Sequence, residues 1–138
     1  MKRTAKAHWQ GNLKEGKGTL STQSEILNKT NYSFKTRFEE GQKGTNPEEL
    51  LAASHAGCFT MSVASILDKR GITSGSLDTD ATLTLEGLSI TAIHLSITGS
   101  VKGINALEFD AVVKEAEQNC IVSKALNVKI TSEAHLVG

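Results

Sequence analysis

The sequence contains little proline, cysteine or aromatic residue of any kind. Its 138 residues include one Pro, two Cys, four Phe, one Tyr and one Trp. The low cysteine content excludes a disulfide scaffold, and the low proline content excludes a collagen-like or proline-rich disordered chain. Fifteen basic side chains balance fifteen acidic ones, so no net charge draws the protein toward nucleic acid or an anionic membrane.

The chain also lacks the segments that would direct it to a membrane. No apolar run in the sequence approaches the ~18 residues of a membrane span. The basic start at Met1–Lys6 continues into His8 and Trp9, not into the apolar stretch of a signal peptide. We therefore expect a cytoplasmic protein, with neither membrane nor nucleic acid as a partner, in which a disulfide would be transient or catalytic.

Periodicity predicts one α+β domain over residues 1–138 with a mainly antiparallel sheet. Residues 32–38 alternate as a strand, which would place Arg37 on its polar side. A long helix over about 47–70 begins at the N-cap Asn46 and ends at Gly71. A second helix begins at about Asn105, and residues 77–101 form two strands with a bulge near Thr91. A last strand covers about residues 128–136.

The long helix carries an unusual stripe of mostly small side chains at helical spacing. Its members are Leu50, Ser54, Gly57, Cys58, Met61 and Ser65. A glycine inside a helix costs about 1 kcal/mol relative to alanine and usually has a packing or functional reason. The stripe therefore predicts that another surface approaches this helix closely.

The two cysteines, Cys58 and Cys120, each fall on the apolar stripe of a helix. They lie 62 positions apart, which excludes a CxxC motif, and two thiols are too few for a structural zinc site. Two interpretations remain open. Both can be inert core residues, or they can form a redox dithiol, which requires their Cα atoms to come within about 4.4–6.8 Å and a cation beside the reactive sulfur.

Three charged or titratable residues are candidates to assist Cys58. Arg37 can supply the cation, because a guanidinium stays charged and can hydrogen-bond a bound oxygen; alone on a strand it can equally be a solvated residue. Glu49 can hold Arg37 in a bidentate pair or simply cap the helix. His55 can act as a base toward Cys58, as in cysteine hydrolases, or can be a packed core histidine.

Several segments together resemble the OsmC/Ohr family of thiol-dependent hydroperoxide reductases, and the osmotically inducible OsmC branch in particular. The resemblance runs from about residue 3 to the C-terminus. It is carried by the segments 46–59 (NPEELLAASHAGCF), 120–126 (CIVSKAL), 8–11 (HWQG), 16–19 (GKGT) and 36–38 (TRF). The His-Ala-Gly-Cys-Phe block with a distant Cys-x-Val-Ser is the most specific of these features.

The resemblance implies a fold, an assembly and roles for four residues. It implies an intertwined homodimer with long central helices packed together and active sites at the subunit interface. Cys58 matches the peroxidatic cysteine and Cys120 the resolving one, while Arg37 matches the arginine that polarises peroxide and thiolate. Glu49 matches the carboxylate that orients this arginine. One departure is Ile121, where the family usually has proline; losing the fixed φ of proline is expected to loosen the turn beside Cys120.

The activity implied is a peroxidase without metal or other cofactor, since the thiolate supplies both nucleophile and electrons. Its substrate would be an organic hydroperoxide, with hydrogen peroxide as a further substrate, and an external dithiol such as a lipoyl group would reduce the resulting disulfide. Two alternatives stay open. The first is a cysteine hydrolase or acyltransferase using Cys58 and His55, and the second is a non-catalytic dimeric binding protein with inert thiols.

Overall fold

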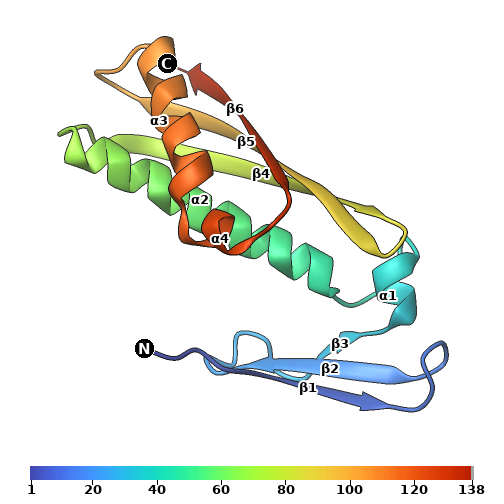
Figure 1. Ribbon diagram of the computed structural model, residues 1–138. Coiled ribbons are helices and arrows are strands. Elements are labelled where there is room, and N and C mark those ends of the chain that lie inside the picture. Colours follow the sequence, from blue (N-terminus) through green and yellow to red (C-terminus); the bar gives the residue numbers. More distant parts are fainter. Residues whose placement is uncertain (138) are drawn as a thin grey trace. The chain divides into compact units, whose positions relative to one another are not determined.

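Three short strands near the N-terminus form the first of two sheets in the computed structural model, which describes residues 1–137 (Figure 1). The strands β1 (Ala5–Gln10), β2 (Lys17–Thr22) and β3 (Thr30–Tyr32) pair antiparallel in sequence order. Gly18 is required at the centre of this sheet, since a Cβ there would lie 2.5 Å from the Tyr32 ring and 2.7 Å from the Trp9 ring. These strands belong to a first compact unit, Met1–Leu50; a second begins at Leu51.

The segment after β3 is a helix, so the predicted strand over residues 32–38 is wrong beyond Tyr32. The helix α1 covers Phe34–Phe38. Ser33 caps it: the Ser33 hydroxyl accepts from the Thr36 amide at 3.2 Å, and the Thr36 hydroxyl accepts from the Ser33 amide at 2.8 Å. The rings of Phe34 and Phe38 lie 4.9 Å apart, because a separation of four residues suits a helix face as well as a strand face. Arg37 is therefore a helical residue.

The long helix α2 covers Pro47–Lys69, close to the predicted bounds. At its start the Asn46 side chain accepts from the Glu49 amide at 2.7 Å. At its end Gly71 has φ +75°, and the Ile72 amide donates to the Leu67 carbonyl at 2.9 Å, which is the closing bond of a Schellman motif. Both ends were predicted correctly, since they depend on local backbone hydrogen bonds.

The second sheet has the order β4-β5-β6. The strands β4 (Ser74–Glu86) and β5 (Ser89–Val101) form an antiparallel hairpin, and β6 (Lys129–Val137) pairs parallel to β5. The predicted bulge is present: Thr84 pairs with Ala92 and Leu85 with Ile90, which leaves Thr91 unpaired. The sheets are therefore mainly antiparallel, as predicted, with one parallel pair.

Two further helices follow β5 in the second unit, α3 (Ala106–Asn119) and the short α4 (Ile121–Ala125). The Asn105 side chain caps α3 by accepting from the Glu108 amide at 2.8 Å. Buried residues of α2, α3 and β5 form one hydrophobic cluster, so both helices cover the same face of the sheet (Figure 1). The cluster consists of Phe59, Val63, Leu67, Ile93, Leu95, Ile97, Val101, Phe109, Val112, Val113, Ala116 and Cys120.

The expectation that no apolar run approaches the length of a membrane span is wrong for α2, which meets the length and hydropathy of such a span, with a mean hydropathy of 1.5 over its most apolar window. Four of its residues, spaced four apart, are nevertheless buried within the protein: His55, Phe59, Val63 and Leu67. A core helix of a soluble protein passes the same test of length and composition, and the regular buried stripe of α2 is compatible with such a helix. The prediction that the two units together make a single domain stays a prediction.

Candidate functional site

Cys58 lies about three turns from the start of α2 and is half-buried against the hydrophobic cluster. It is a free thiol. Its neighbour Gly57 is exposed, and a Cβ added there would meet no atom within 4 Å. Met61, one turn further along the same face, is 75% exposed. The sulfur therefore sits where the buried face of α2 meets an open face of small and flexible side chains.

Cys120 is the second free thiol, and it is buried, with 2% of its surface exposed. It ends α3 and begins α4: its backbone N–H donates to the Ala116 carbonyl at the end of α3, and its side chain caps the start of α4. Its sulfur accepts from the Ser123 amide at 3.4 Å and lies 3.0 Å from the Ser123 hydroxyl. Ile121 occupies the first position of α4, where proline would be favoured, and α4 forms with isoleucine there. That Ile121 alters the reactivity of Cys120 stays a prediction.

His55 is fully buried and contacts the Cys120 turn. Its Nε2 atom lies 2.8 Å from the hydroxyl of Ser123, so this hydrogen bond joins α2 to α4. The hydrolase alternative requires His55 to serve as a base for Cys58, but the nitrogen that forms a hydrogen bond is engaged with Ser123 instead. Burial lowers the pKa of His55 below its usual value, so the ring is neutral at neutral pH.

The lowered pKa of His55 predicts how stability depends on pH. The unfolded chain binds a proton at this histidine below about pH 6.5, whereas the folded protein binds it only at lower pH. The free energy of unfolding should therefore decrease as pH falls below about 6.5, with a slope of up to ~1.4 kcal/mol per pH unit from this residue. Urea unfolding at a series of pH values and one protein concentration measures this slope.

A matched pair of variants isolates the contribution of His55 to that slope. His55→Gln keeps an N–H donor but cannot titrate, so its unfolding free energy should depend less on pH between about 5 and 6.5. His8→Gln makes the same chemical change at an exposed side chain of β1 and should keep the wild-type slope. Equal slopes in the wild type and His55→Gln would show that His55 does not titrate differently in the folded protein.

Arg37 forms an ion pair within the first unit. Its Nε donates to Glu48 Oε1 at 2.5 Å, and its guanidinium carbon lies 5.4 Å above the centre of the Phe38 ring. The Arg37 side chain is 47% exposed, whereas that of Glu48 is 11% exposed. Glu49, the predicted partner, accepts from the Thr45 hydroxyl at 2.8 Å. In the structure Arg37 therefore pairs with Glu48, the residue that precedes the predicted partner Glu49.

Sequence reasoning missed two residues that contact the predicted ones, Glu48 and Ser123. For Glu48 the signal was present, because two consecutive glutamates begin α2 and either could reach Arg37. For Ser123 the signal was the spacing Cys-x-x-Ser, in which an N-cap side chain meets the amide three residues later. Its bond to His55 joins residues 68 positions apart, and no local pattern indicates it.

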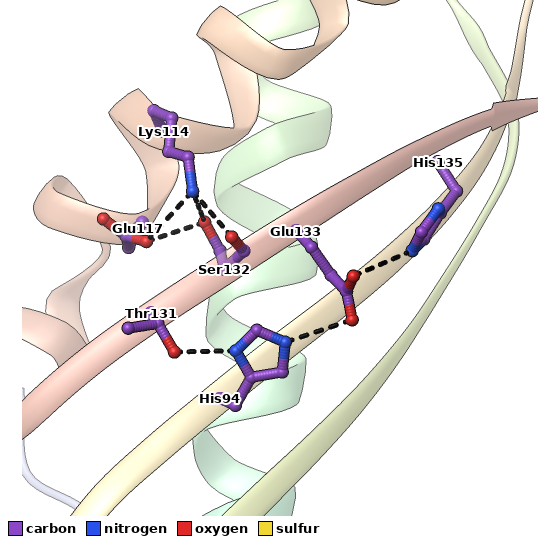
Figure 2. Close-up of polar contacts among 7 residues, drawn as sticks. All are labelled: His94, Lys114, Glu117, Thr131, Ser132, Glu133 and His135. Carbon is purple, nitrogen blue, oxygen red and sulfur yellow. Dashed lines mark hydrogen bonds and ion pairs between the residues drawn. The ribbon is translucent and has the colours of Figure 1, made fainter.

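The strands β5 and β6 carry a separate polar cluster on the exposed face of the second sheet (Figure 2). Glu133 accepts from His94 at 3.1 Å and pairs with His135 at 3.4 Å. The hydrogen bond from His94, and then the charge of His135, lower the pKa of Glu133. His94 also bonds the Thr131 hydroxyl at 2.6 Å. Over residues 1–137, no group of three or more His, Cys, Asp or Glu side chains is arranged to hold a metal ion.

Comparison with known proteins identifies relatives over nearly the whole chain. The profile of the family described as OsmC-like protein matches residues 40–133. The chain is 46% identical over 134 residues to the protein named peroxiredoxin OsmC of Escherichia coli, covering 94% of this chain and 93% of that protein. It is 33% identical over 104 residues to the organic hydroperoxide resistance protein OhrA of Bacillus subtilis, covering 70% and 72% of the two chains.

Solved structures agree on the fold. A solved structure described as an OsmC-like protein of unknown function from Vibrio cholerae superimposes with a TM-score of 0.74, covering 97% of this chain and 99% of that one. Its sequence identity is 16%, so this likeness concerns the fold alone.

Proposed function

Because the chain belongs to the OsmC-like family, we propose that it is a thiol-dependent peroxidase that reduces organic hydroperoxides, and hydrogen peroxide as well, in defence against oxidative and osmotic stress. The observation that carries this proposal is the 46% identity to the Escherichia coli peroxiredoxin over 94% of the chain. The apolar surroundings of both sulfurs favour an organic hydroperoxide over a small, fully hydrated one.

The proposed reaction uses both cysteines. The Cys58 thiolate attacks one peroxide oxygen, the O–O bond breaks, and the products are a sulfenic acid and an alcohol, or water when the substrate is hydrogen peroxide. The Cys120 sulfur then attacks the sulfenic sulfur, so that an S–S bond forms and water leaves. An external dithiol, such as a lipoyl group, reduces the disulfide by thiol exchange. The sulfur chemistry needs no metal or other cofactor.

Arg37 would stabilise the Cys58 thiolate and hold the peroxide during attack, as the family resemblance implies. A guanidinium suits this role because it stays charged and presents several N–H donors in one plane. Its ion pair with Glu48 supports a positioned rather than a freely moving side chain, which adds Glu48 to the candidate site. We keep the proposal that Glu49 also orients Arg37, in addition to Glu48.

The test of the proposed function is the intact mass of the protein after one equivalent of cumene hydroperoxide. The reduced protein should lose two hydrogens, and both cysteines should then resist alkylation until a dithiol is added. An unchanged mass with two alkylatable thiols would contradict the peroxidase. Formation of a stable acyl adduct on Cys58 from a thioester, without involvement of Cys120, would support the hydrolase alternative.

We also propose that the protein is a homodimer with its active sites at the subunit interface. The sequence predicts that another surface packs against the stripe of small residues on α2. In the single chain this stripe is uncovered, because Ser54, Gly57, Met61 and Ser65 are all exposed. A second copy packed against this stripe would bury Met61 and would cover the open side of Cys58. The four residues buried on the opposite face of α2 support a soluble protein, which we place in the cytoplasm.

A large side chain in the stripe should prevent the dimer from forming. Gly57→Leu removes a helix-propensity penalty of about 1 kcal/mol, so the stability of the helix should not decrease. The added side chain occupies the space that a second copy requires. Sedimentation equilibrium should show the wild type as a dimer and the variant at the 14.7 kDa of one chain. Ala111→Leu, at an exposed position of α3, should remain dimeric. A monomeric wild type at working concentration would contradict the proposal.

A further inference from the structure

A chain of hydrogen bonds inside the second unit ends on the sulfur of Cys120. It begins at His55 of α2, whose Nε2 lies 2.8 Å from the Ser123 hydroxyl, and continues over 3.0 Å from that hydroxyl to Cys120 Sγ. The three residues are 0%, 7% and 2% exposed in this order. The Ser123 amide also donates to the same sulfur at 3.4 Å, so two groups of one residue converge on it.

The surroundings of the His55 imidazole decide which atom donates in each of these hydrogen bonds. The other ring nitrogen, Nδ1, is buried without a hydrogen-bond partner among residues 1–137. A buried acceptor lone pair without a partner costs less than a buried N–H donor without one, so the proton belongs on Nε2. His55 then donates to the Ser123 oxygen, which leaves the Ser123 hydroxyl hydrogen available for Cys120 Sγ. When that sulfur is a thiolate it has no hydrogen of its own, so the hydroxyl is the donor between these two atoms.

We propose that His55 and Ser123 are positioning residues for the second step of the reaction, holding two hydrogen-bond donors on Cys120 so that its sulfur reacts as a thiolate. The inference rests on the proposed function, since it concerns the thiol that would resolve the sulfenic acid on Cys58. Hydrogen bonds to a charged group are roughly twice as strong as those between neutral groups. The chain therefore stabilises the thiolate more than the thiol.

The step balances without any further reactant. The Cys120 thiol loses its proton to water, and the thiolate gives an electron pair to the sulfenic sulfur of Cys58. The S–S bond forms as the S–O bond breaks, and the departing hydroxide takes up a proton to become water. Cys120 is oxidised in this step and the sulfenic sulfur is reduced.

The neutral, donating imidazole distinguishes this role from general-base catalysis. With its hydrogen on Nε2, His55 has no lone pair facing Ser123 and cannot accept the Cys120 proton along the chain. Its bond to Ser123 also ties the Cys120 turn to the helix that carries Cys58 three residues further on. The expected contribution of His55 is thus to orient a hydroxyl and to hold a turn, and any N–H donor at the same place should replace it.

Single-turnover kinetics with one equivalent of cumene hydroperoxide separate the two steps. Peroxide consumption reports the sulfenic acid, and rapid acid quenching followed by intact mass reports the disulfide. Ser123→Ala should slow disulfide formation by about 10- to 100-fold, the usual range for a lost hydrogen bond to a charged group, while the rate of peroxide consumption is maintained. Dimedone should trap more sulfenic acid in this variant, and in Cys120→Ser it should trap nearly all of it.

Two variants of His55 test the donor role. His55→Leu should slow disulfide formation like Ser123→Ala, whereas His55→Gln should remain within a few-fold of the wild type, because its side-chain amide can donate from nearly the same position. The control is Ser132→Ala. Ser132 is also 7% exposed and donates a part-buried hydrogen bond to Glu117 at 2.7 Å (Figure 2). It contacts neither thiol, so the disulfide of the Ser132→Ala variant should form at the wild-type rate.

A second readout does not depend on peroxidase activity. In a Cys58→Ser background, the ultraviolet absorbance of the Cys120 thiolate at one fixed pH should fall when Ser123 is replaced by alanine. Wild-type absorbance and disulfide formation at the wild-type rate in Ser123→Ala would overturn the inference. If His55→Gln formed the disulfide as slowly as His55→Leu, the donor role of His55 would be contradicted, and a titrating base would be indicated in its place. A wild type that consumes no peroxide would overturn the proposed function instead, while the absorbance would still decide the inference.

Discussion

Replacement of Cys58 by serine should reduce peroxide turnover to the uncatalysed background. The hydroxyl of serine is far less nucleophilic than a thiolate at neutral pH and cannot be oxidised to a sulfenic acid. The substitution changes one half-buried atom, so the protein should still unfold in a single cooperative transition. Peroxide consumption with an excess of a lipoyl-type dithiol, together with a thermal unfolding curve, measures both expectations.

Cys120→Ser is the matched control for Cys58→Ser, because it makes the same chemical change at the other sulfur. It should consume one equivalent of peroxide quickly and then stall, with a sulfenic acid on Cys58 that excess peroxide over-oxidises. Substantial steady turnover by Cys58→Ser would rule out Cys58 as the peroxidatic residue. Turnover of Cys120→Ser at the wild-type rate, with no inactivation by excess peroxide, would show that Cys120 does not resolve the sulfenic acid.

Removal of the Arg37 guanidinium should have the second-largest effect. Arg37→Met deletes the positive charge and every N–H donor, so turnover should decrease by about 100- to 1000-fold, as is typical when a group that stabilises developing charge is lost. Arg37→Lys keeps the charge but not the planar set of donors. It should keep Cys58 reactive toward iodoacetamide while losing most of its peroxide turnover.

Two conservative variants identify the carboxylate that positions Arg37. Glu48→Gln weakens the ion pair that the structure contains, whereas Glu49→Gln alters a side chain bonded to the Thr45 hydroxyl. We expect Glu48→Gln to reduce turnover more than Glu49→Gln and less than Arg37→Met. A larger loss in Glu49→Gln would mean that Arg37 changes partner when the site binds peroxide. Wild-type turnover in Arg37→Met would contradict a role for Arg37 in the reaction and would show that it is a solvated residue of α1.

Local signals in the sequence predicted the parts of the fold that depend on neighbouring residues. Asn46 and Gly71 place the ends of α2 because caps satisfy backbone groups within three to five residues along the chain. The bulge at Thr91 followed from a change in the phase of alternation between Ile90 and Ile93, which is equally local. The same kind of signal failed at Phe34 and Phe38, whose spacing suits a strand and a helix alike, and the Ser33 cap decided for the helix.

The residue types at the candidate site could also be predicted from the sequence. Cys58 and Cys120 were identified because they are the two thiols of the chain and because each stands in a segment that resembles a known family. Arg37 and Glu49 were candidates because of their charge and position, and the resemblance assigned their roles. A resemblance transfers roles to positions, but it does not state which of two adjacent carboxylates an arginine contacts, and here Arg37 bonds to Glu48.

Only the tertiary structure decided which distant residues meet. His55 and Ser123 lie 68 positions apart, and the cluster of His94 with Glu133 and His135 exists because β6 pairs parallel to β5. Such contacts require the chain between them to close a long loop and a strand to adopt one register among several. The net gain from packing the whole core selects that register, and periodicity within a short segment contains no information about it.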